Sequence, residues 1–312
     1  MLVIKNLEKS YGDFKAVRGL NLEIKKGEIF GFIGPNGAGK STTMKIISGL
    51  LSPDSGEVYV DGIDAIKNNK ALKDKIGYMP DFFGVYDNLK AIEYLEFYAS
   101  IYGIVGKEAK ELSMDLLRLV NLEDKYDAYV DGLSRGMKQR LCLARCLVHN
   151  PDLLILDEPA SGMDPRARYE MKGILRNLKE MGKTIIVSSH ILPELGEVCT
   201  NIGIVKNGVV VCQGTVDEIM TRAAGASPIV FTVLGGKEEE AIKLLKELPY
   251  VDNIKIDGNK ITANVIGSDL EAANLLKYLV LKDIPVLNYS RAVGNLEDVF
   301  IQITADSDEE EV

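Results

Sequence analysis

The sequence has no long apolar run. None of its 312 residues belongs to a stretch of about 18 consecutive apolar residues, so no segment is expected to span a bilayer as a helix. The first ten residues, MLVIKNLEKS, also lack the apolar region of a secretory signal. We therefore expect a cytoplasmic protein, and we expect any contact with the cell membrane to be peripheral, on its inner face.

Cysteine is scarce, and its spacing matches no known signature. The four cysteines form no CxxC pair and no spacing with histidine that is typical of a metal site. We expect reduced thiols with structural roles at Cys142, Cys146, Cys199 and Cys212.

Positive charge is in deficit. The chain has 37 Lys and Arg against 46 Asp and Glu, which gives a formal net charge of −9. A protein that binds nucleic acid through its overall field carries the opposite sign, so we expect no nucleic acid partner. The length of 312 residues exceeds what one core usually organises, and it predicts a large domain with a smaller one.

A glycine-rich loop is the first strong motif. A strand is expected at residues 29–33 and a helix from about Lys40, and between them the sequence follows the spacing GxxxxGK[ST]. Backbone amides of such a loop turn inward around phosphate oxygens, Lys40 adds a positive charge, and Ser41 can offer its hydroxyl to Mg²⁺. The alternative is a flexible glycine turn. The predicted phosphate-binding residues are Asn36, Gly37, Ala38, Gly39, Lys40, Ser41 and Thr42.

Two carboxylates follow a second apolar run. Asp157 and Glu158 come directly after LLIL, which reads as a buried parallel strand that delivers both acids to the ligand edge of a sheet. Asp157 suits Mg²⁺, directly or through water, and Glu158 is available to polarise an attacking water. The alternative is two acids in an exposed turn before Pro159. Beside a phosphate loop, the pair indicates hydrolysis of a nucleoside triphosphate.

The two histidines differ in their setting. His190 closes the β-branched run TIIVSSH, so it also stands at the carboxyl end of a strand, within reach of a γ-phosphate. A structural histidine remains an equal alternative for this residue. His149 lies near the end of an expected helix, where an imidazole commonly complements the helix dipole, and we assign it no chemistry.

An unusual helix start occurs at LSRGMKQR, residues 133–140. Ser134 and Gly136 open an apolar helical stripe, and the cations Arg135, Lys138 and Arg140 follow within its first turns. Because the amino end of a helix favours negative charge, cations there are unfavourable unless an anion is present. The pattern therefore predicts an anion-binding helix terminus.

Five motifs occur in the order GPNGAGKST, LSRGMKQR, LLILDEP, SGMDP and IVSSH. As an ordered set they closely resemble the ATP-binding subunit of ABC transporters, over roughly Met1 to Thr221. The resemblance implies an α/β P-loop ATPase domain of the ABC type at residues 1–221, with a helical subdomain at about 82–150. It also implies ATP and Mg²⁺ as ligands, and a head-to-tail dimer in which the LSRGMKQR helix of one chain faces the γ-phosphate held by the other.

The resemblance assigns roles to individual positions. Tyr11 would stack on adenine, with Val17 packing nearby, although Tyr11 by itself is equally typical of a core aromatic. Glu158 would keep the catalytic role, and His190 would sense the γ-phosphate. In the opposite chain's site, Ser134 and the Gly136 amide would contact the γ-phosphate, and Asp164 of SGMDP would cross the dimer interface.

The sequence departs from the family's pattern at two places. In the LSRGMKQR motif, Arg135 replaces the more usual glycine and Met137 the usual glutamine, while the phosphate-facing Ser134 and Gly136 remain. In IGYMPDFFG, Asp81 stands where the family normally has a glutamine that touches Mg²⁺ and the membrane subunit. A carboxylate is also an oxygen ligand for a hard cation, so we expect Asp81 at the metal.

Residues 82–129 mix aromatic and aliphatic side chains at helical spacing. By itself this pattern is more typical of a small helical core. In the family, the region forms a helical subdomain whose groove receives a short helix of the permease.

The remainder of the chain predicts a second, smaller domain. Residues 222–227 are expected to be a linker, and residues 228–305 follow the order β-α-β-β-α-β of a ferredoxin-like accessory domain. Regulation, support of the dimer and partner binding are open alternatives for its role. Residues 306–312 are expected to be a solvated acidic tail.

The sequence thus predicts a cytoplasmic ATPase subunit of an exporter-type ABC transporter. Its expected partners are a polytopic membrane permease and a second ATP-binding subunit, with homodimer and heterodimer both open. One alternative is a soluble ABC-type ATPase of DNA repair or translation, although no coiled-coil insertion, zinc module or second cassette is visible. A second alternative is a regulatory subunit without hydrolysis, which retention of Glu158 and His190 disfavours.

Overall fold

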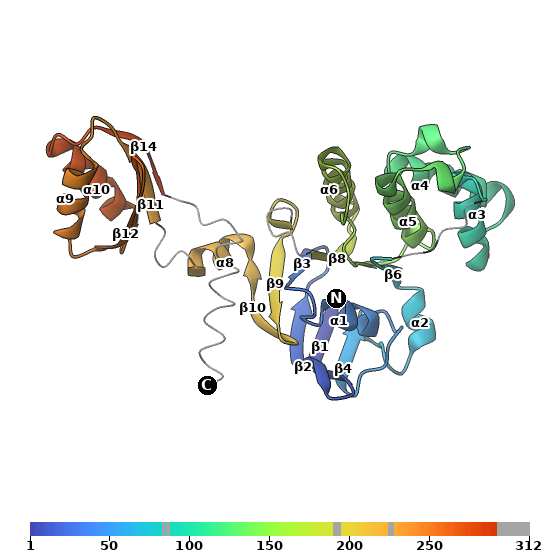
Figure 1. The fold of residues 1–312 in the computed structure, drawn as a ribbon. Coiled ribbons are helices and arrows are strands. Elements are labelled where there is room, and N and C mark those ends of the chain that lie inside the picture. Colours follow the sequence, from blue (N-terminus) through green and yellow to red (C-terminus); the bar gives the residue numbers. More distant parts are fainter. Residues whose placement is uncertain (83, 85–87, 190–194, 224–227, 292–312) are drawn as a thin grey trace. The chain divides into compact units, whose positions relative to one another are not determined.

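The computed structural model describes residues 1–291 except 83, 85–87, 190–194 and 224–227 (Figure 1). The chain divides into two compact units, Met1–Val216 and Asp217–Val312. The boundary expected after residue 221 falls within helix α8 (Val216–Ala223), which spans the division between the units. No helix within the described ranges is both long enough and apolar enough to cross a membrane.

Unit 1 is built around a six-stranded sheet in the order β10-β9-β3-β8-β7-β6. Strands β9, β3, β8, β7 and β6 are parallel, and β10 returns antiparallel after a tight turn at Asn207 and Gly208. Both turn residues have positive φ, 48° and 82°, as an Asn-Gly hairpin turn requires. The strands are β3 (Ile29–Ile33), β6 (Ile76–Met79), β7 (Leu153–Leu156), β8 (Thr184–Ser189), β9 (Asn201–Lys206) and β10 (Val209–Thr215).

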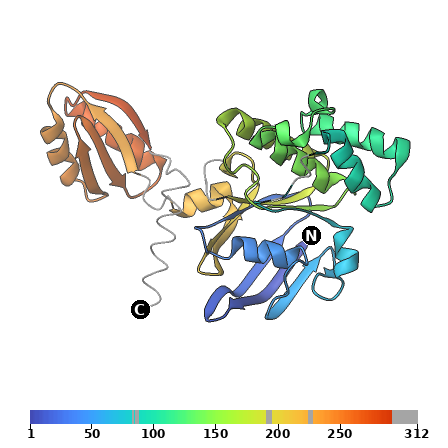
Figure 2. The ribbon, with the colours of Figure 1, turned by 45° about the vertical axis from the view of Figure 1, so that its right-hand side comes forward.

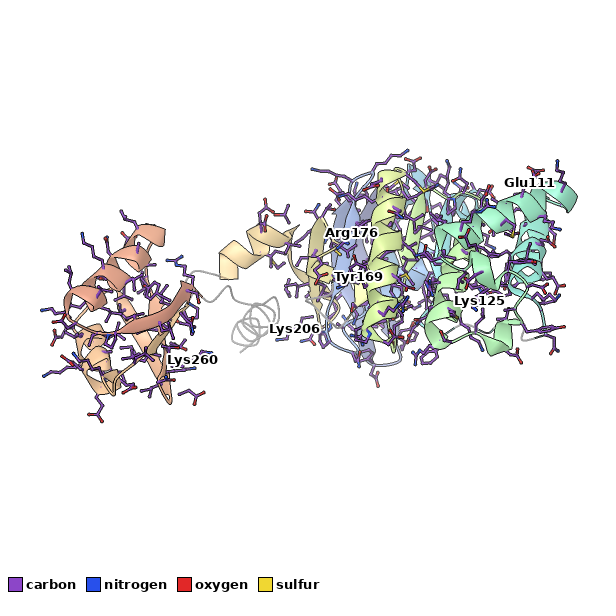
Figure 3. The ribbon with its side chains drawn as sticks, turned by 90° about the horizontal axis from the view of Figure 1, so that it is seen from above. Glu111, Lys125, Tyr169, Arg176, Lys206 and Lys260 are labelled. Atoms are coloured by element: carbon purple, nitrogen blue, oxygen red, sulfur yellow. The ribbon has the colours of Figure 1, made fainter. Side chains whose placement is uncertain are left out.

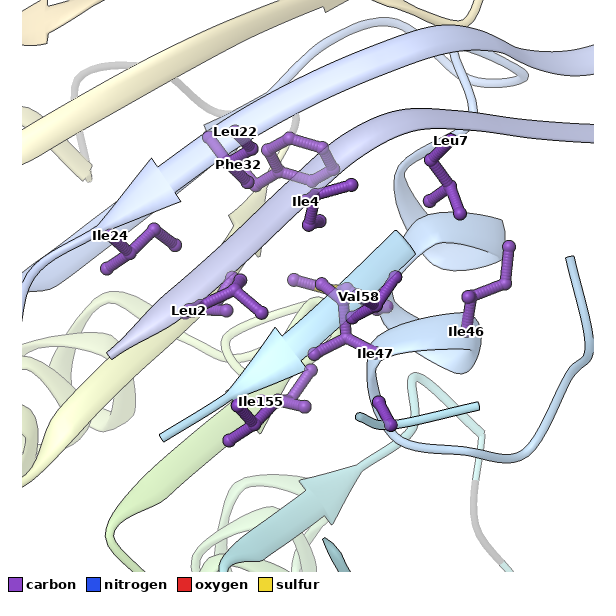
Figure 4. Close-up of a cluster of buried hydrophobic side chains, with 14 of the residues drawn as sticks. Leu2, Ile4, Leu7, Leu22, Ile24, Phe32, Ile46, Ile47, Val58 and Ile155 are labelled. Carbon is purple, nitrogen blue, oxygen red and sulfur yellow. The ribbon is translucent and has the colours of Figure 1, made fainter. Parts of the chain in front are cut away.

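A second, antiparallel sheet in the order β2-β1-β4-β5 packs against the first through helix α1 (Lys40–Ile47). Its strands are β1 (Leu2–Tyr11), β2 (Phe14–Ile24), β4 (Ser55–Val60) and β5 (Ile63–Asp64). Figure 4 shows the apolar side chains that fill the space between the layers. They come from both sheets and from α1, and include Leu2, Ile4, Leu22, Phe32, Ile47, Val58 and Ile155.

Helices form the rest of unit 1, and α3, α4 and α5 pack on one another within the range expected for a helical subdomain (Figure 1). Tyr94 of α3 is fully buried among them, and its hydroxyl accepts a hydrogen bond from Arg145 at 3.3 Å. The helices are α2 (Asn69–Lys73), α3 (Ala91–Ile101), α4 (Gly106–Leu119), α5 (Arg135–Leu147) and α6 (Pro165–Glu180), with 3₁₀ turns at Glu123–Lys125 and Val130–Gly132.

Arg140 corrects the expectation of three cations around an anion at the start of α5. Its side chain is buried, and its Nη1 donates to the carbonyl oxygens of Val120 and Asn121 at 3.1 and 3.0 Å. The same nitrogen lies 3.0 Å from a carboxylate oxygen of Glu170 on α6. Arg140 stands more than one turn into the helix and faces the interior, so it joins α4, α5 and α6 rather than the helix terminus.

His149 has a structural setting, in agreement with the absence of assigned chemistry. Its Nε2 lies 2.9 Å from the carbonyl oxygen of Ile76, and its ring stacks on Tyr102 with the ring centroids 4.3 Å apart. Burial lowers the pKa of His149 below its usual value, so the neutral ring is favoured.

Unit 2 has the order β-α-β-β-α-β expected for residues 228 onwards, as far as residue 291. Its sheet runs β12-β13-β11-β14 with antiparallel neighbours throughout, and α9 and α10 cover one face (Figure 2). The elements are β11 (Pro228–Val233), α9 (Glu238–Lys246), β12 (Val251–Asp257), β13 (Lys260–Val265), α10 (Asp269–Leu281) and β14 (Val286–Arg291). The expected tail at 306–312 lies outside the described residues.

Arg140 provides a test of this packing because Glu170 has a second cationic partner. Arg166 also approaches Glu170, at 3.3 Å, but its side chain is 90% exposed, against 7% for Arg140. Replacing Arg140 by Met removes the donor to the carbonyl oxygens of Val120 and Asn121 and the cationic partner of the Glu170 carboxylate. We expect Arg140→Met to lower the free energy of unfolding by about 2 to 3 kcal/mol.

The matched control is Arg166→Met, which removes an exposed partner of the same carboxylate and should cost at most about 0.5 kcal/mol. Urea unfolding followed by circular dichroism measures both variants. Equal losses for the two would contradict the structural role given to Arg140.

Candidate active site

The glycine-rich loop joins the carboxyl end of β3 to the first turn of α1. Gly37 and Gly39 have φ of 83° and 100°, a region that residues with a side chain rarely adopt. A Cβ at Gly39 would also collide with the carbonyl oxygen of Ala16 on β2. The first turn of α1 contains no acidic residue. The backbone therefore leaves a helix amino end free of negative charge behind a tight loop, which is the setting that favours a phosphate.

The turn between β9 and β10 is far from this loop in the sequence but contacts it directly. The Gly208 amide donates to the Ala38 carbonyl at 3.1 Å, and the Gly208 carbonyl accepts from the Arg18 amide at 2.9 Å. A Cβ at Gly208 would come within 2.8 Å of the Ala16 oxygen. This contact joins segments far apart in the chain, so the sequence alone did not reveal that the turn supports the phosphate loop.

Lys40 lies inside the loop, with only 6% of the residue exposed. Its ammonium group donates to the carbonyl oxygens of Gly34 at 2.7 Å and Pro35 at 3.1 Å. Burial lowers the pKa of Lys40, while the negative charges of Glu158 and Asp157 act in the opposite direction. The lysine is thus a positive charge positioned between the loop and the two carboxylates.

Asp157 is the buried centre of the site, 3% exposed at the end of β7. Its Oδ1 accepts hydrogen bonds from Ser188 Oγ of β8 at 2.7 Å and from Ser41 Oγ of α1 at 3.1 Å. Its amide donates to the Met79 carbonyl at the end of β6 at 2.8 Å. Through its carboxylate and its amide, Asp157 therefore joins α1, β8 and β6 at the carboxyl edge of the sheet.

Ser188 was missed by sequence reasoning, although its position as a polar residue near the carboxyl end of an apolar strand is a usable signal. Besides donating to Asp157, its Oγ accepts from the Glu158 amide at 2.9 Å. Glu158 has φ of 51°, a left-handed conformation that is uncommon for residues other than glycine. Ser161 donates its amide to the Glu158 carbonyl at 3.0 Å, so hydrogen bonds on both sides of the residue hold this conformation.

The phosphate loop borders a cavity of about 220 Å³. The structure brings together the whole predicted loop, Tyr11, Asp81 and Glu158, whereas Asp157 lies behind Ser41. The lining residues are Tyr11, Phe14, Ala16, Asn36, Gly37, Ala38, Gly39, Lys40, Ser41, Thr42, Asp81 and Glu158.

An aromatic pair forms the far end of the cavity. Tyr11 and Phe14 face each other across the tight turn between β1 and β2, and they are 50% and 57% exposed. Directly opposed residues of an antiparallel pair project from the same face, so both rings are available to one flat ligand. Phe14 was not predicted. Val17, expected near adenine, is buried in the core and does not line the cavity, whereas Ala16 does.

The remaining predicted residues lie elsewhere. Ser134 caps α5 by accepting from the Met137 amide at 3.3 Å, and Asp164 caps α6 by accepting from the Ala167 amide at 2.9 Å. Neither residue, nor Gly136, lines the cavity. His190 lies outside the described residues, directly after the end of β8.

Comparison with known proteins agrees with the geometry. A family model described as ABC transporter matches residues 17–161. The linearmycin resistance ATP-binding protein LnrL of Bacillus subtilis is 34% identical over 306 residues, which cover 97% of this chain and 98% of that protein. Nod factor export ATP-binding protein I of Burkholderia orbicola is 35% identical over 301 residues, which cover 96% of this chain and 95% of that protein.

Among solved structures, a dimeric ATP-binding cassette in a post-hydrolysis state with ADP and Pi superposes with a TM-score of 0.64 at 30% identity. The match covers 69% of this chain and 98% of the cassette. The chain therefore belongs to the ATP-binding proteins of ABC transporters, as its motifs predicted. It binds ATP, hydrolyses it to ADP and phosphate, and supplies ATP-driven transport with its energy.

The aromatic pair predicts how the base is held. Stacking of a base on an aromatic side chain contributes on the order of 1 to 3 kcal/mol, so Tyr11→Ala should raise the Kd for ATP about tenfold. Phe14→Ala should raise it as well, because the second ring borders the same space. Titration with a fluorescent ATP analogue measures both.

Tyr169→Ala is the matched control, since Tyr169 is a 71% exposed tyrosine on α6 outside the cavity (Figure 3). Unchanged affinity in the Phe14 variant would remove that residue from the nucleotide site.

Proposed function

We propose that this protein works as one half of a dimer of ATP-binding subunits that drives export through a separate membrane permease. The observation that carries the proposal is the division of the predicted site. The cavity holds the phosphate loop, Tyr11 and Glu158, while Ser134 and Gly136 open a different helix and do not reach it. A second chain would bring its own α5 to the γ-phosphate and complete the site. Similarity to Nod factor export ATP-binding protein I supports export as the direction.

Within one site, the residues divide the work of hydrolysis. Lys40 and the amides of the loop bind the phosphates, and Glu158 orients the attacking water and accepts its proton. The left-handed backbone of Glu158, held by Ser188 and Ser161, keeps its carboxylate at the cavity instead of in the strand direction. Phosphoryl transfer needs this positioning and charge stabilisation more than covalent chemistry.

Mg²⁺ fits the donor set. Ser41 and Asp81 line the cavity, and Asp157 lies behind it within hydrogen-bond distance of Ser41. All three carry oxygen ligands of the type that Mg²⁺ prefers. Bound with ATP, the ion would offset negative charge on the phosphates. Asp81 gives this site one carboxylate more than the family's glutamine, and we place it at the metal. We likewise assign the γ-phosphate contact to His190.

The catalytic assignment is tested by Glu158→Gln. Removing the carboxylate charge while keeping the side-chain volume should lower ATP turnover at least about a hundredfold. ATP binding should persist, so the variant should accumulate as an ATP-bound dimer, measured by size-exclusion chromatography with light scattering.

Lys40→Ala is the complementary variant, because it should lose ATP affinity and therefore fail to dimerise. Turnover of Glu158→Gln at the rate of the unchanged protein would remove Glu158 from the mechanism, and unchanged ATP affinity of Lys40→Ala would do the same for the lysine.

We place the permease contact at a groove of about 620 Å³ between α4 and the end of α5. Its floor is apolar and aromatic, with the stacked rings of Tyr102 and His149 beside Ile104, Leu112 and Val148. Four carboxylates stand around it, on Asp74, Glu108, Glu111 and Asp115, and Figure 3 shows Glu111 on α4. An apolar floor with an acidic rim fits a short amphipathic helix that carries basic residues. Docked there, the protein would be peripheral on the inner face of the membrane.

Charge reversal tests this contact. The double variant Glu108→Lys with Glu111→Lys should reduce co-purification of the permease from detergent-solubilised membranes about tenfold or more, because like charges now meet. ATP hydrolysis by the isolated protein should be unchanged. The control is Glu239→Lys with Glu240→Lys, which reverses two acids in the first turn of α9.

Mass spectrometry of the purified complex identifies the partner. A stoichiometric polytopic membrane protein supports the transporter assignment, and a second cassette in the complex would decide for a heterodimer. Only soluble or ribosomal partners would overturn the role of the groove and favour a soluble ATPase.

We interpret unit 2 as a ferredoxin-like accessory domain. The curated relatives align over 96% and 97% of the chain, whereas the solved cassette covers 69% of it. The longer alignment with these relatives supports an additional domain after the cassette, and the strand order of unit 2 supports its interpretation as ferredoxin-like.

A further inference from the structure

Arg135, the residue that departs from the family's glycine, lies against Gly162 of the SGMDP loop in the same chain. A Cβ placed at Gly162 would be 2.5 Å from Arg135 Cζ, 2.6 Å from its Nη1 and 2.9 Å from its Nε. This Cβ position is about equally near three atoms of the planar group, and the central carbon Cζ is the nearest. The flat face of the guanidinium therefore lies against Gly162. Only a glycine leaves room for that contact, and Gly162 also has a φ of 68°.

Two further contacts connect the same parts. Gln139 of α5 donates its Nε2 hydrogen to the Ser161 carbonyl at 3.2 Å. A Cβ at Gly136 would come within 3.0 Å of Ala167 Cβ, so the start of α5 and the start of α6 approach closely. The first turns of α5 are therefore packed on the loop that precedes α6.

That loop leads directly back to the catalytic residue. Ser161 holds the Glu158 carbonyl through its amide, and Asp164 fixes the other end of the loop to α6. Through Arg135 and Gly162, the helix terminus that bears Ser134 is thus connected by packing to Glu158. The two ends of this connection belong to different ATP sites of a dimer: Ser134 to the partner's nucleotide and Glu158 to the chain's own.

The charge of Arg135 needs an explanation of its own. Arg135 is exposed, it is the first residue of α5, and the first turn of that helix has no acidic residue to offset it. A cation there is unfavourable for the isolated helix. Two interactions can offset this cost: attraction of the guanidinium to a bound anion, and its contact with the loop at Gly162.

We propose that Arg135 is a positioning residue that couples the two ATP sites by holding the SGMDP loop through Gly162. This inference rests on the dimer of the proposed function. An incoming γ-phosphate of the partner's ATP attracts the guanidinium and fixes the start of α5. The loop is fixed with it, and this positions the carboxylate of Glu158 in the same chain for hydrolysis. Hydrolysis at one site then depends on occupancy of the other.

The test is the ATPase rate of the full-length protein as a function of ATP concentration. With two coupled sites, the unchanged protein should show a Hill coefficient approaching about 2, and Arg135→Ala should bring it to about 1. Its kcat should fall about tenfold, while the Kd of the separate chain for ATP stays unchanged. Arg135→Lys should not rescue, because an ammonium group has charge but no flat face to lie on Gly162.

Gly162→Ala separates coupling from a general effect of the mutation. In the unchanged background its side chain displaces the guanidinium, whereas in the Arg135→Ala background only the strain of the positive φ remains. The kcat losses of the two single variants should therefore not multiply in the double variant. Arg166→Ala is the control, since it removes an exposed cation from the first turn of α6 without touching Gly162.

The inference is overturned if Arg135→Ala keeps the Hill coefficient and kcat, if Arg135→Lys behaves like the unchanged protein, or if the unchanged protein hydrolyses ATP without cooperativity. Failure of the proposed function has a different signature, because Glu158→Gln would then remain monomeric with saturating ATP.

Discussion

The site depends on one buried carboxylate. Asp157 is almost fully enclosed, and burial of a carboxylate is costly unless hydrogen bonds and nearby positive charge compensate it. The hydroxyls of Ser41 and Ser188 supply the hydrogen bonds, and the Lys40 ammonium supplies the charge. Because these groups come from α1, β8 and the phosphate loop, satisfying Asp157 fixes the loop relative to the sheet. Ser188, which binds Asp157, also accepts a hydrogen bond from the Glu158 amide and so holds the backbone of Glu158.

Local pattern was sufficient for the parts of the site that lie on one continuous segment. The phosphate loop follows directly from its spacing, and the strands at residues 29–33 and 153–156 begin and end as predicted, since fully buried parallel strands read as short apolar runs. The ABC-type fold and ATP hydrolysis could likewise be predicted, because five motifs in order are far more specific than any one of them.

What could not be predicted are pairings between segments far apart in the sequence. Ser188 acts on Asp157 and Glu158 across about 30 residues, and Phe14 reaches the cavity only because a two-residue turn sets it opposite Tyr11. Arg140 was predicted to be part of an anion site because three cations lie close together in the sequence. The helix directs its side chain toward Glu170 and the interior, and the sequence alone does not show which face of the helix is buried.

The left-handed backbone of Glu158 has a consequence for how this sequence can change. A residue with a side chain in that conformation stores strain on the order of 1 kcal/mol, which glycine would release. A change that only relieves this strain would therefore remove the carboxylate that we propose for polarising the attacking water. At this position, the backbone conformation costs folding stability, while the side chain that causes the cost is the one we propose for turnover.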